Sequence, residues 1–198
     1  MTPFSSQELR KGFASFATGV TVITCLDSDQ NAHGITLSSF NTVSLEPPLI
    51  LWSLKKHSRL MPHFEVAHKQ LIHVLARSQE AMAMHFATVK ENQFDSIPHQ
   101  IAESGLTQID GCCAYFECET VSVHTGGDHN IIVAKVLNLK HDPLSHPLIF
   151  AHSQFMGLDS SLEKYQNRNF HDALMGKKKF YQCAEGYMVS CRVRIARG

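Results

Sequence analysis

Three short polar stretches carry the side chains best suited to binding or catalysis. Residues 36–39 place a threonine and two serines shortly after Gly34. Residues 55–59 place two lysines and an arginine around Ser58. Residues 126–129 are two glycines followed by Asp128 and His129. Short hydroxyls, backbone amides and cations of this kind suit a flat polar ligand or a phosphate.

The residues by themselves leave a plainer reading open for each stretch. Thr36, Ser38 and Ser39 can approach a ligand without bringing fixed charge, or they can solvate a hairpin turn. Residues 55–59 can cradle an anion, or they can form an ordinary solvated loop. His129 can donate to a ligand or carry a proton, or it can hold its own turn in place.

The first stretch opens a predicted pair of strands. Val43 and Leu45 alternate with polar residues, which indicates a strand with one buried face. Residues 46–48 are Glu-Pro-Pro and end that strand, because proline fixes φ and has no N–H. Residues 49–52 have no polar alternation, so we expect a second strand that is buried on both faces.

The rest of the chain alternates predicted strands with a few helices. Ser5 and Glu8 have the spacing of a capping box, and the helix they begin would carry Leu9 and end at Gly19. We expect Ser78 to cap a second long helix, Ser58 to cap a short one, and residues 94–109 to be irregular. Further strands are expected at residues 20–24, 71–75, 112–123, 131–137, 148–150 and 187–193. This pattern predicts a mainly β fold, a closed or nearly closed barrel with helical decorations.

Composition excludes several classes of protein. The chain has 198 residues, with 18 basic and 18 acidic side chains, so it lacks the basic footprint of a nucleic-acid binder. No apolar run is long enough to span a membrane, and no signal peptide is recognisable. Six cysteines without a CxxC pair indicate reduced thiols and a cytoplasmic protein.

The common catalytic and metal motifs are missing from the sequence. There is no GxGxxG, GxxxxGK[ST], HExxH or GxSxG pattern. The 13 histidines are scattered, and His63 and His68 stand five residues apart, which is out of phase for one metal on a helix. We therefore expect no metal site.

The order and spacing of several segments resemble the flavin reductase family, whose members include reductase components of two-component monooxygenases. The segments that carry the resemblance are FATGVTVIT at residues 16–24, GITLSSF at 34–40, SLEPPL at 44–49, residues 74–79, 86–87 and 123–124, GGDH at 126–129 and PLIF at 147–150. The resemblance covers residues 9–157. Residues 158–198 have no counterpart in it, and they are expected to form a C-terminal extension of the flavin reductase-like domain at 1–157.

The resemblance implies a homodimer of six-stranded Greek-key split β-barrels of the FMN-binding type, with FMN or FAD as cofactor and NAD(P)H as co-substrate. It implies that residues 36–39, including Leu37, contact the isoalloxazine and ribityl parts. It places Ser53, Lys55, Ser58 and Arg59 near the phosphate, and Ala76, Arg77 and Gln79 on another side of the flavin. His129 is the implied catalytic residue, as a donor that orients flavin or nicotinamide.

The implied activity is hydride transfer from NAD(P)H to the bound flavin, with an oxygenase component as the partner that receives reduced flavin. This chain departs from the family pattern at His73, Ala134 and Phe155, where asparagine, glycine and a tyrosine are frequent. The missing tyrosine hydroxyl keeps an alternative open, a flavin-binding or electron-transfer protein without NAD(P)H turnover. Haem in place of flavin is a third and weaker alternative.

Overall fold

The computed structural model describes residues 3–89, 91–157, 181–182 and 188–189. Contacts between Cα atoms divide the chain into two units, Met1–Gly157 and Leu158–Gly198. In the second unit, β13 (Tyr181–Gln182) pairs with β14 (Met188–Val189). The strand expected at 187–193 is thus seen only at β14, and its other positions lie outside the described residues.

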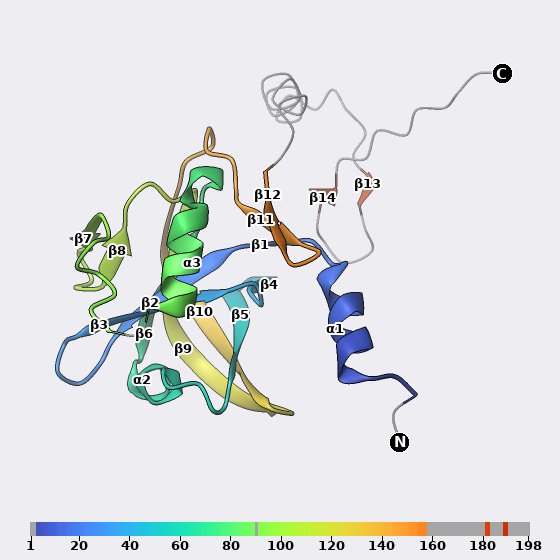
Figure 1. The fold of residues 1–198 in the computed structure, drawn as a ribbon. Helices are drawn as coiled ribbons and strands as arrows, with labels where there is room; N and C mark the ends of the chain where they lie inside the picture. The colour runs from blue at the N-terminus through green and yellow to red at the C-terminus, as the bar shows by residue number, and fades with distance from the viewer. Residues whose placement is uncertain (1–2, 90, 158–180, 183–187, 190–198) are drawn as a thin grey trace. The chain divides into compact units, whose positions relative to one another are not determined.

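A single antiparallel sheet of seven strands forms the body of the first unit (Figure 1). Its order is β3 (Ala32–Leu37), β2 (Thr21–Leu26), β6 (Lys69–Val74), β9 (Ala114–Gly126), β10 (His129–His141), β5 (Pro48–Lys55) and β4 (Asn41–Leu45). Strands β6, β9 and β10 are consecutive neighbours and β5 returns beside β10, which is a Greek-key arrangement.

The sheet curls but does not close. Its two edge strands, β3 and β4, are joined by residues 38–40, and within the described residues they form no ladder with each other. The predicted mainly β fold, a Greek-key split barrel with helical decorations, is confirmed. The expected six-stranded count is wrong, because the hydrogen-bonded sheet has seven strands.

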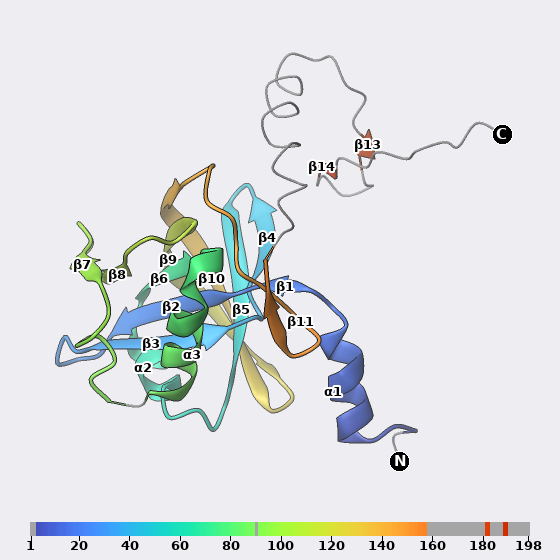
Figure 2. The same ribbon diagram turned by 45° about the horizontal axis from the view of Figure 1, so that its top comes forward.

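Two apolar clusters hold the sheet together. One fills the inside of the curled sheet and includes Ile23 and Trp52, both fully buried. The other lies beneath α3 (Glu80–Thr88), which crosses β2 and β3 in both views (Figures 1 and 2), and includes Val22 and Phe86. Strand β2 separates the clusters, so its successive side chains are buried on opposite faces.

Residues 49–52 were expected to form a strand that is buried on both faces, and this expectation is wrong. Along β5 the side chains of Ile50, Trp52 and Leu54 are buried, whereas Leu49 and Leu51 are half-buried. Among the described residues, no helix packs extensively on β5, so its outward-facing side chains keep part of their contact with solvent. The preceding strand β4 is also more exposed than predicted, with Leu45 86% exposed.

The helix beginnings were predicted with mixed success. The capping box is confirmed, since Ser5 Oγ accepts from the Glu8 N–H and the Glu8 carboxylate accepts from the Ser5 N–H. That helix, α1 (Ser6–Ala14), ends before Gly19, because β1 (Thr18–Gly19) pairs with β11 (Ile149–Ala151). No residue of α1 is buried.

The predicted cap at Ser78 is wrong. Residues Arg77–Gln79 form a 3-10 turn, η1, and α3 begins at Glu80. The side chain of Gln79 stabilises the turn by accepting from the Ala76 N–H at 2.9 Å. The expected cap at Ser58 is also wrong, because Leu60 is the N-cap of the short helix α2 (Met61–Val66) and no side chain caps it. The Ser58 hydroxyl accepts from the Leu60 N–H instead.

Residues 94–109 are less irregular than expected. They contain two short paired strands, β7 (His99–Ile101) and β8 (Thr107–Ile109). Strand β12 (Gln154–Met156) completes the first unit by pairing with β11. Among the described residues, no helix combines the length and apolar character that crossing a bilayer requires.

Candidate functional site

A cavity of about 350 Å³ lies between the end of β3, the end of β5, the loop that follows β5, and the start of β10. Its lining side chains are Ile35, Leu37, Ser53, Leu54, Lys55, His57, Ser58 and His129. Five of these were singled out from the sequence, and they come from three distant segments of the chain. The structure therefore brings much of the predicted site together.

Strand register explains why these segments meet. His129 is the first residue of β10 and pairs with Lys55, the last residue of β5. The loop after β5 is closed onto the β9–β10 turn, because the Lys56 N–H donates to the Asp128 carbonyl and the Lys56 ammonium donates to the Gly127 carbonyl. Lys56 thus holds the loop in place, while Lys55 and Ser58 face the cavity.

His129 is oriented by its neighbour in the chain. Its Nδ1 lies 2.7 Å from a carboxylate oxygen of Asp128. This hydrogen bond lowers the pKa of Asp128, so the carboxylate stays charged and fixes Nδ1 as the protonated nitrogen. The other ring nitrogen, Nε2, is then the one that can contact a ligand in the cavity.

The hydroxyls of residues 36–39 have different surroundings. Thr36 Oγ1 donates to the Ala83 carbonyl of α3 at 2.7 Å. Ser39 Oγ bonds the backbone of Ser53, and Ser38 is exposed. Two of the three hydroxyls are therefore engaged in holding the site, which leaves Ser38 and the backbone amides to meet a ligand.

The group formed by Ala76, Arg77 and Gln79 lies at the same edge of the sheet but does not line this cavity. Thr21 pairs with Leu37 on one side and with Val74 on the other, so β3 and β6 end at the same level on either side of β2. Gln79 Nε2 donates to the Asp110 carbonyl at 2.7 Å. The Arg77 side chain packs so closely on Gly157 that an added Cβ there would collide with it.

Arg59 also points away from the cavity. Its guanidinium donates to the Val89 carbonyl, just after the last turn of α3, at 3.2 Å. Of the three cations expected around Ser58, only Lys55 lines the cavity. Arg59 instead ties the loop after β5 to the end of α3.

Sequence reasoning missed Ile35, Leu54 and His57, which also line the cavity. The signal for Ile35 was available, because residues two apart on a strand share a face and Leu37 had been selected. Leu54 is buried and borders the cavity from the core side. His57 lies in a loop, where no periodicity predicts the direction of a side chain.

The three departures from the family pattern occupy packed positions. His73 is buried, with Nδ1 donating to the Val22 carbonyl and Nε2 accepting from the Ile109 N–H. Ala134 is fully buried inside the sheet. Phe155 packs on Phe150, with ring centroids 5.3 Å apart.

Comparison with known proteins agrees with this geometry. Residues 13–159 match the flavin reductase like domain. The chain is 40% identical over 143 residues to the FMN reductase (NADH) SmoA of Agrobacterium fabrum, covering 71% of this chain and 81% of that protein.

A second relative is the reductase component of the flavin-dependent trigonelline monooxygenase of Acinetobacter baylyi, 39% identical over 132 residues. The match covers 67% of this chain but only 43% of that protein, so this chain spans less than half the length of that relative.

A solved structure of the NADH:FAD oxidoreductase of Streptomyces globisporus, in complex with NAD and FAD fragments, superimposes with a TM-score of 0.76 at 32% identity. It covers 80% of this chain and 96% of that one. Residues 13–159 match the family, and the relatives share these identities and the split-barrel fold. The chain therefore belongs to the flavin reductase family.

Proposed function

We propose that the protein is an NAD(P)H-dependent flavin reductase that takes FMN, or FAD, and passes a hydride from the nicotinamide to the flavin. The observation that carries the proposal is the cavity in which Ser53, Lys55, Ser58 and His129 converge, in a chain of the flavin reductase family. Relatives named for FMN and FAD reduction with NADH support the choice of cofactor and co-substrate.

The side chains of the cavity fit a flavin mononucleotide chemically. Ser53 and Ser58 offer hydroxyl donors and Lys55 offers an ammonium, which suits a phosphate. Ile35 and Leu37 offer apolar surface, which suits a flat ring. We assign the phosphate to the side of the cavity formed by Lys55 and Ser58, with Arg59 closing the loop behind it.

The remaining predicted residues border the same edge of the sheet. We assign Thr36, Leu37, Ser38 and Ser39 to the ring and ribityl side, largely through backbone groups. The η1 segment, with Ala76, Arg77 and Gln79, would face the flavin from the end of β6, which is level with the end of β3 across β2.

Flavin supplies the capacity to accept a hydride, so the protein itself needs no general base for that transfer. Its contribution is to place nicotinamide and flavin in contact and to exclude water. His129 fits the role of an orienting group, because Asp128 accepts from Nδ1 and leaves Nε2 for a ligand in the cavity. In the neutral ring Nε2 is an acceptor, and it becomes the expected donor only when the ring carries both protons.

The test is oxidation of NADH and of NADPH by the purified protein with added FMN or FAD, after its visible spectrum has been recorded. Turnover supports the reductase and identifies the preferred nicotinamide and flavin. A yellow protein without turnover would overturn the proposal in favour of flavin binding or electron transfer alone. A haem spectrum would overturn the choice of flavin.

A homodimer is part of the proposal. Apolar side chains are exposed on the adjacent strands β9 and β10, at Val121, Val123, Leu137 and Leu139, and exposed patches of this kind mark interaction surfaces. Light scattering should give twice the mass of the chain. The double variant Val121→Lys/Leu139→Lys should give the monomer mass, and Lys140→Ala, next to the patch, should leave the dimer intact.

We further propose that an oxygenase component receives the reduced flavin, as the name of the Acinetobacter baylyi relative suggests for that protein. We assign the reductase to residues 1–157 and regard residues 158–198 as an extension. A cytoplasmic location is supported by the described cysteines, which are buried free thiols at Cys25, Cys112, Cys113 and Cys118.

A further inference from the structure

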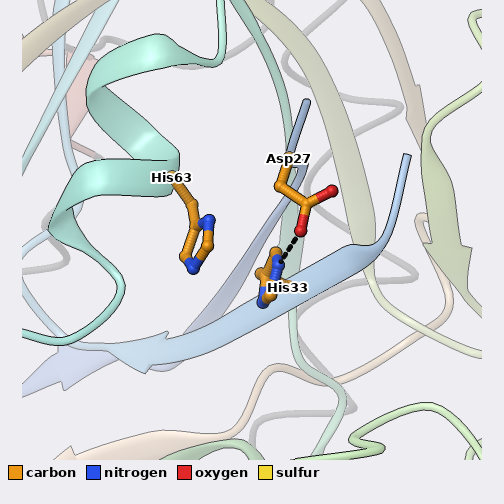
Figure 3. A group of neighbouring side chains, drawn as sticks. All are labelled: Asp27, His33 and His63. Atoms are coloured by element: carbon orange, nitrogen blue, oxygen red, sulfur yellow. Dashed lines mark hydrogen bonds and ion pairs between the residues drawn. The ribbon is translucent and has the colours of Figure 1, made fainter. Parts of the chain in front are cut away.

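Asp27, His33 and His63 form a compact group (Figure 3), and none of them lines the proposed flavin site. Asp27 directly follows β2, His33 lies in β3, and His63 lies in α2. One potential ligand atom from each side chain lies within 4.8 Å of the other two. All three residues are half-buried, so the group is shielded but open to ions from solvent.

The carboxylate of Asp27 is held in a fixed orientation. Its Oδ1 accepts from the Asp29 N–H at 2.9 Å and from the Asn31 N–H at 2.8 Å. Its Oδ2 accepts from the Asn31 side-chain amide at 3.2 Å and lies 2.9 Å from His33 Nε2. Supporting hydrogen bonds of this kind preorganise a metal ligand, because its position no longer has to be fixed on binding.

The distance between Asp27 and His33 already suits a shared ion. Two ligand atoms at about 2.1 Å from one ion lie about 3 Å apart when they are at right angles, as in an octahedral site, and about 3.4 Å apart at the tetrahedral angle that Zn²⁺ prefers. The 2.9 Å between Asp27 Oδ2 and His33 Nε2 is close to the first of these values. An ion would lie to one side of the line between these two atoms, so it could replace the hydrogen of this hydrogen bond once the His33 ring turns to direct its Nε2 lone pair at the ion.

His63 would supply the third ligand after a rotation. Its ring is now stacked on that of His33, with centroids 3.8 Å apart and planes 11° from parallel. Parallel stacked rings cannot both direct a nitrogen lone pair at one ion, so the His63 ring must leave the stack. Rotation about its terminal torsion is soft in histidine, and the ring is already within reach of the other two ligands.

We propose that Asp27, His33 and His63 form a binding site for one divalent transition-metal ion, such as Zn²⁺ or Ni²⁺, with water completing its coordination. Two imidazoles and one carboxylate favour these ions over Mg²⁺ and Ca²⁺, which prefer oxygen ligands.

Such an ion would connect the turn between β2 and β3 to α2. The loop that lines the cavity leads directly into this helix, and the Met61 N–H at its start donates to the Ser58 carbonyl at 3.0 Å. Metal binding would thereby stabilise the loop that carries His57 and Ser58. This site and the proposed reductase activity are independent, so one can fail while the other stands.

The test uses tag-free protein that has been treated with a chelator and then titrated calorimetrically with Zn²⁺ and, separately, with Ni²⁺. We expect one ion per chain and a rise in Tm when the ion is present. His63→Ala should weaken binding by at least about 10-fold and remove the rise in Tm, since a lost ligand costs at least as much as a lost supporting group. His33→Gln should do the same.

His68→Ala is the matched control, because His68 is an exposed histidine five residues after His63 in the sequence and outside the group. It should bind the ion as the unchanged protein does. The proposal is overturned if the unchanged protein binds no ion at a one-to-one ratio. It is equally overturned if His63→Ala binds as well as the unchanged protein, or if His68→Ala loses as much affinity as His63→Ala.

Discussion

The hydroxyl of Ser39 makes two hydrogen bonds to the backbone of Ser53, donating to its carbonyl and accepting from its N–H, each at 3.0 Å. Ser39 lies in the connection between the two edge strands, and Ser53 lies in β5. One side chain thus joins the segment after β3 to a wall of the cavity, at the place where the sheet remains open.

Replacement of Ser39 should affect both stability and flavin binding. Ser39→Ala removes both hydrogen bonds and should lower the free energy of unfolding by about 1–3 kcal/mol, measured by urea denaturation. Ser39→Glu places a negative charge in the segment assigned to the ring and ribityl side of the flavin and should abolish flavin retention. Ser38→Ala, at the exposed neighbouring serine, should leave stability unchanged. Full flavin occupancy in purified Ser39→Glu would show that the site is misplaced.

His129 should matter more for turnover than its neighbour Asp128. His129→Ala removes the proposed orienting hydrogen bond from Nε2 and should reduce kcat/KM for NADH by about 10- to 100-fold, the worth of one hydrogen bond in a site. Asp128→Asn keeps an acceptor for Nδ1 and should cost much less. Circular dichroism should show both variants folded. If His129→Ala retains the kcat/KM of the unchanged protein, the orienting role is refuted.

Gly34 is required where α3 meets β3. A Cβ at this position would lie 2.6 Å from two ring carbons of Phe86, which is closer than packed side chains approach. Gly34→Ala should therefore lower the free energy of unfolding by about 1–3 kcal/mol. Phe86→Leu in the same chain should recover part of this loss relative to Phe86→Leu alone. Gly19→Ala is the control, since no atom lies within 4 Å of its added Cβ.

The buried His73 should make stability depend on pH. Burial lowers its pKa from 6.5 to about 4. Between these values the unfolded chain binds a proton at this ring and the folded chain does not. The free energy of unfolding should therefore fall as the pH is lowered from 6.5 toward 4, by up to about 1.4 kcal/mol per pH unit. Above pH 6.5 this contribution is constant.

Urea denaturation across pH 7.5 to 4.5 measures this dependence, and His73→Phe separates it from other titrating groups. The variant cannot take up the proton, so its stability should depend less steeply on pH in the same window. Its absolute stability should also be lower, because the Val22 carbonyl and the Ile109 N–H lose their partner. Equal slopes for the two proteins would exclude His73 as the source.

The sequence by itself determined the order of strands and the segments that meet at the site. Alternation and β-branched runs predicted β2, β6, β9 and β10, and the capping box at Ser5 predicted the start of α1. These signals are local, because each depends on residues within a few positions of one another. The site residues Ser53, Lys55, Ser58 and His129 were found through the resemblance.

Only the tertiary structure decided which side chains face the cavity and which hold it in place. Arg59 and Gln79 were expected to contact the flavin, yet the Arg59 side chain donates to the Val89 carbonyl and the Gln79 side chain donates to the Asp110 carbonyl. The grouping of His63 with Asp27 and His33 likewise depends on α2 lying against the hairpin of β2 and β3. Such contacts join residues that are distant in the chain, and packing of the whole sheet and its helices sets them.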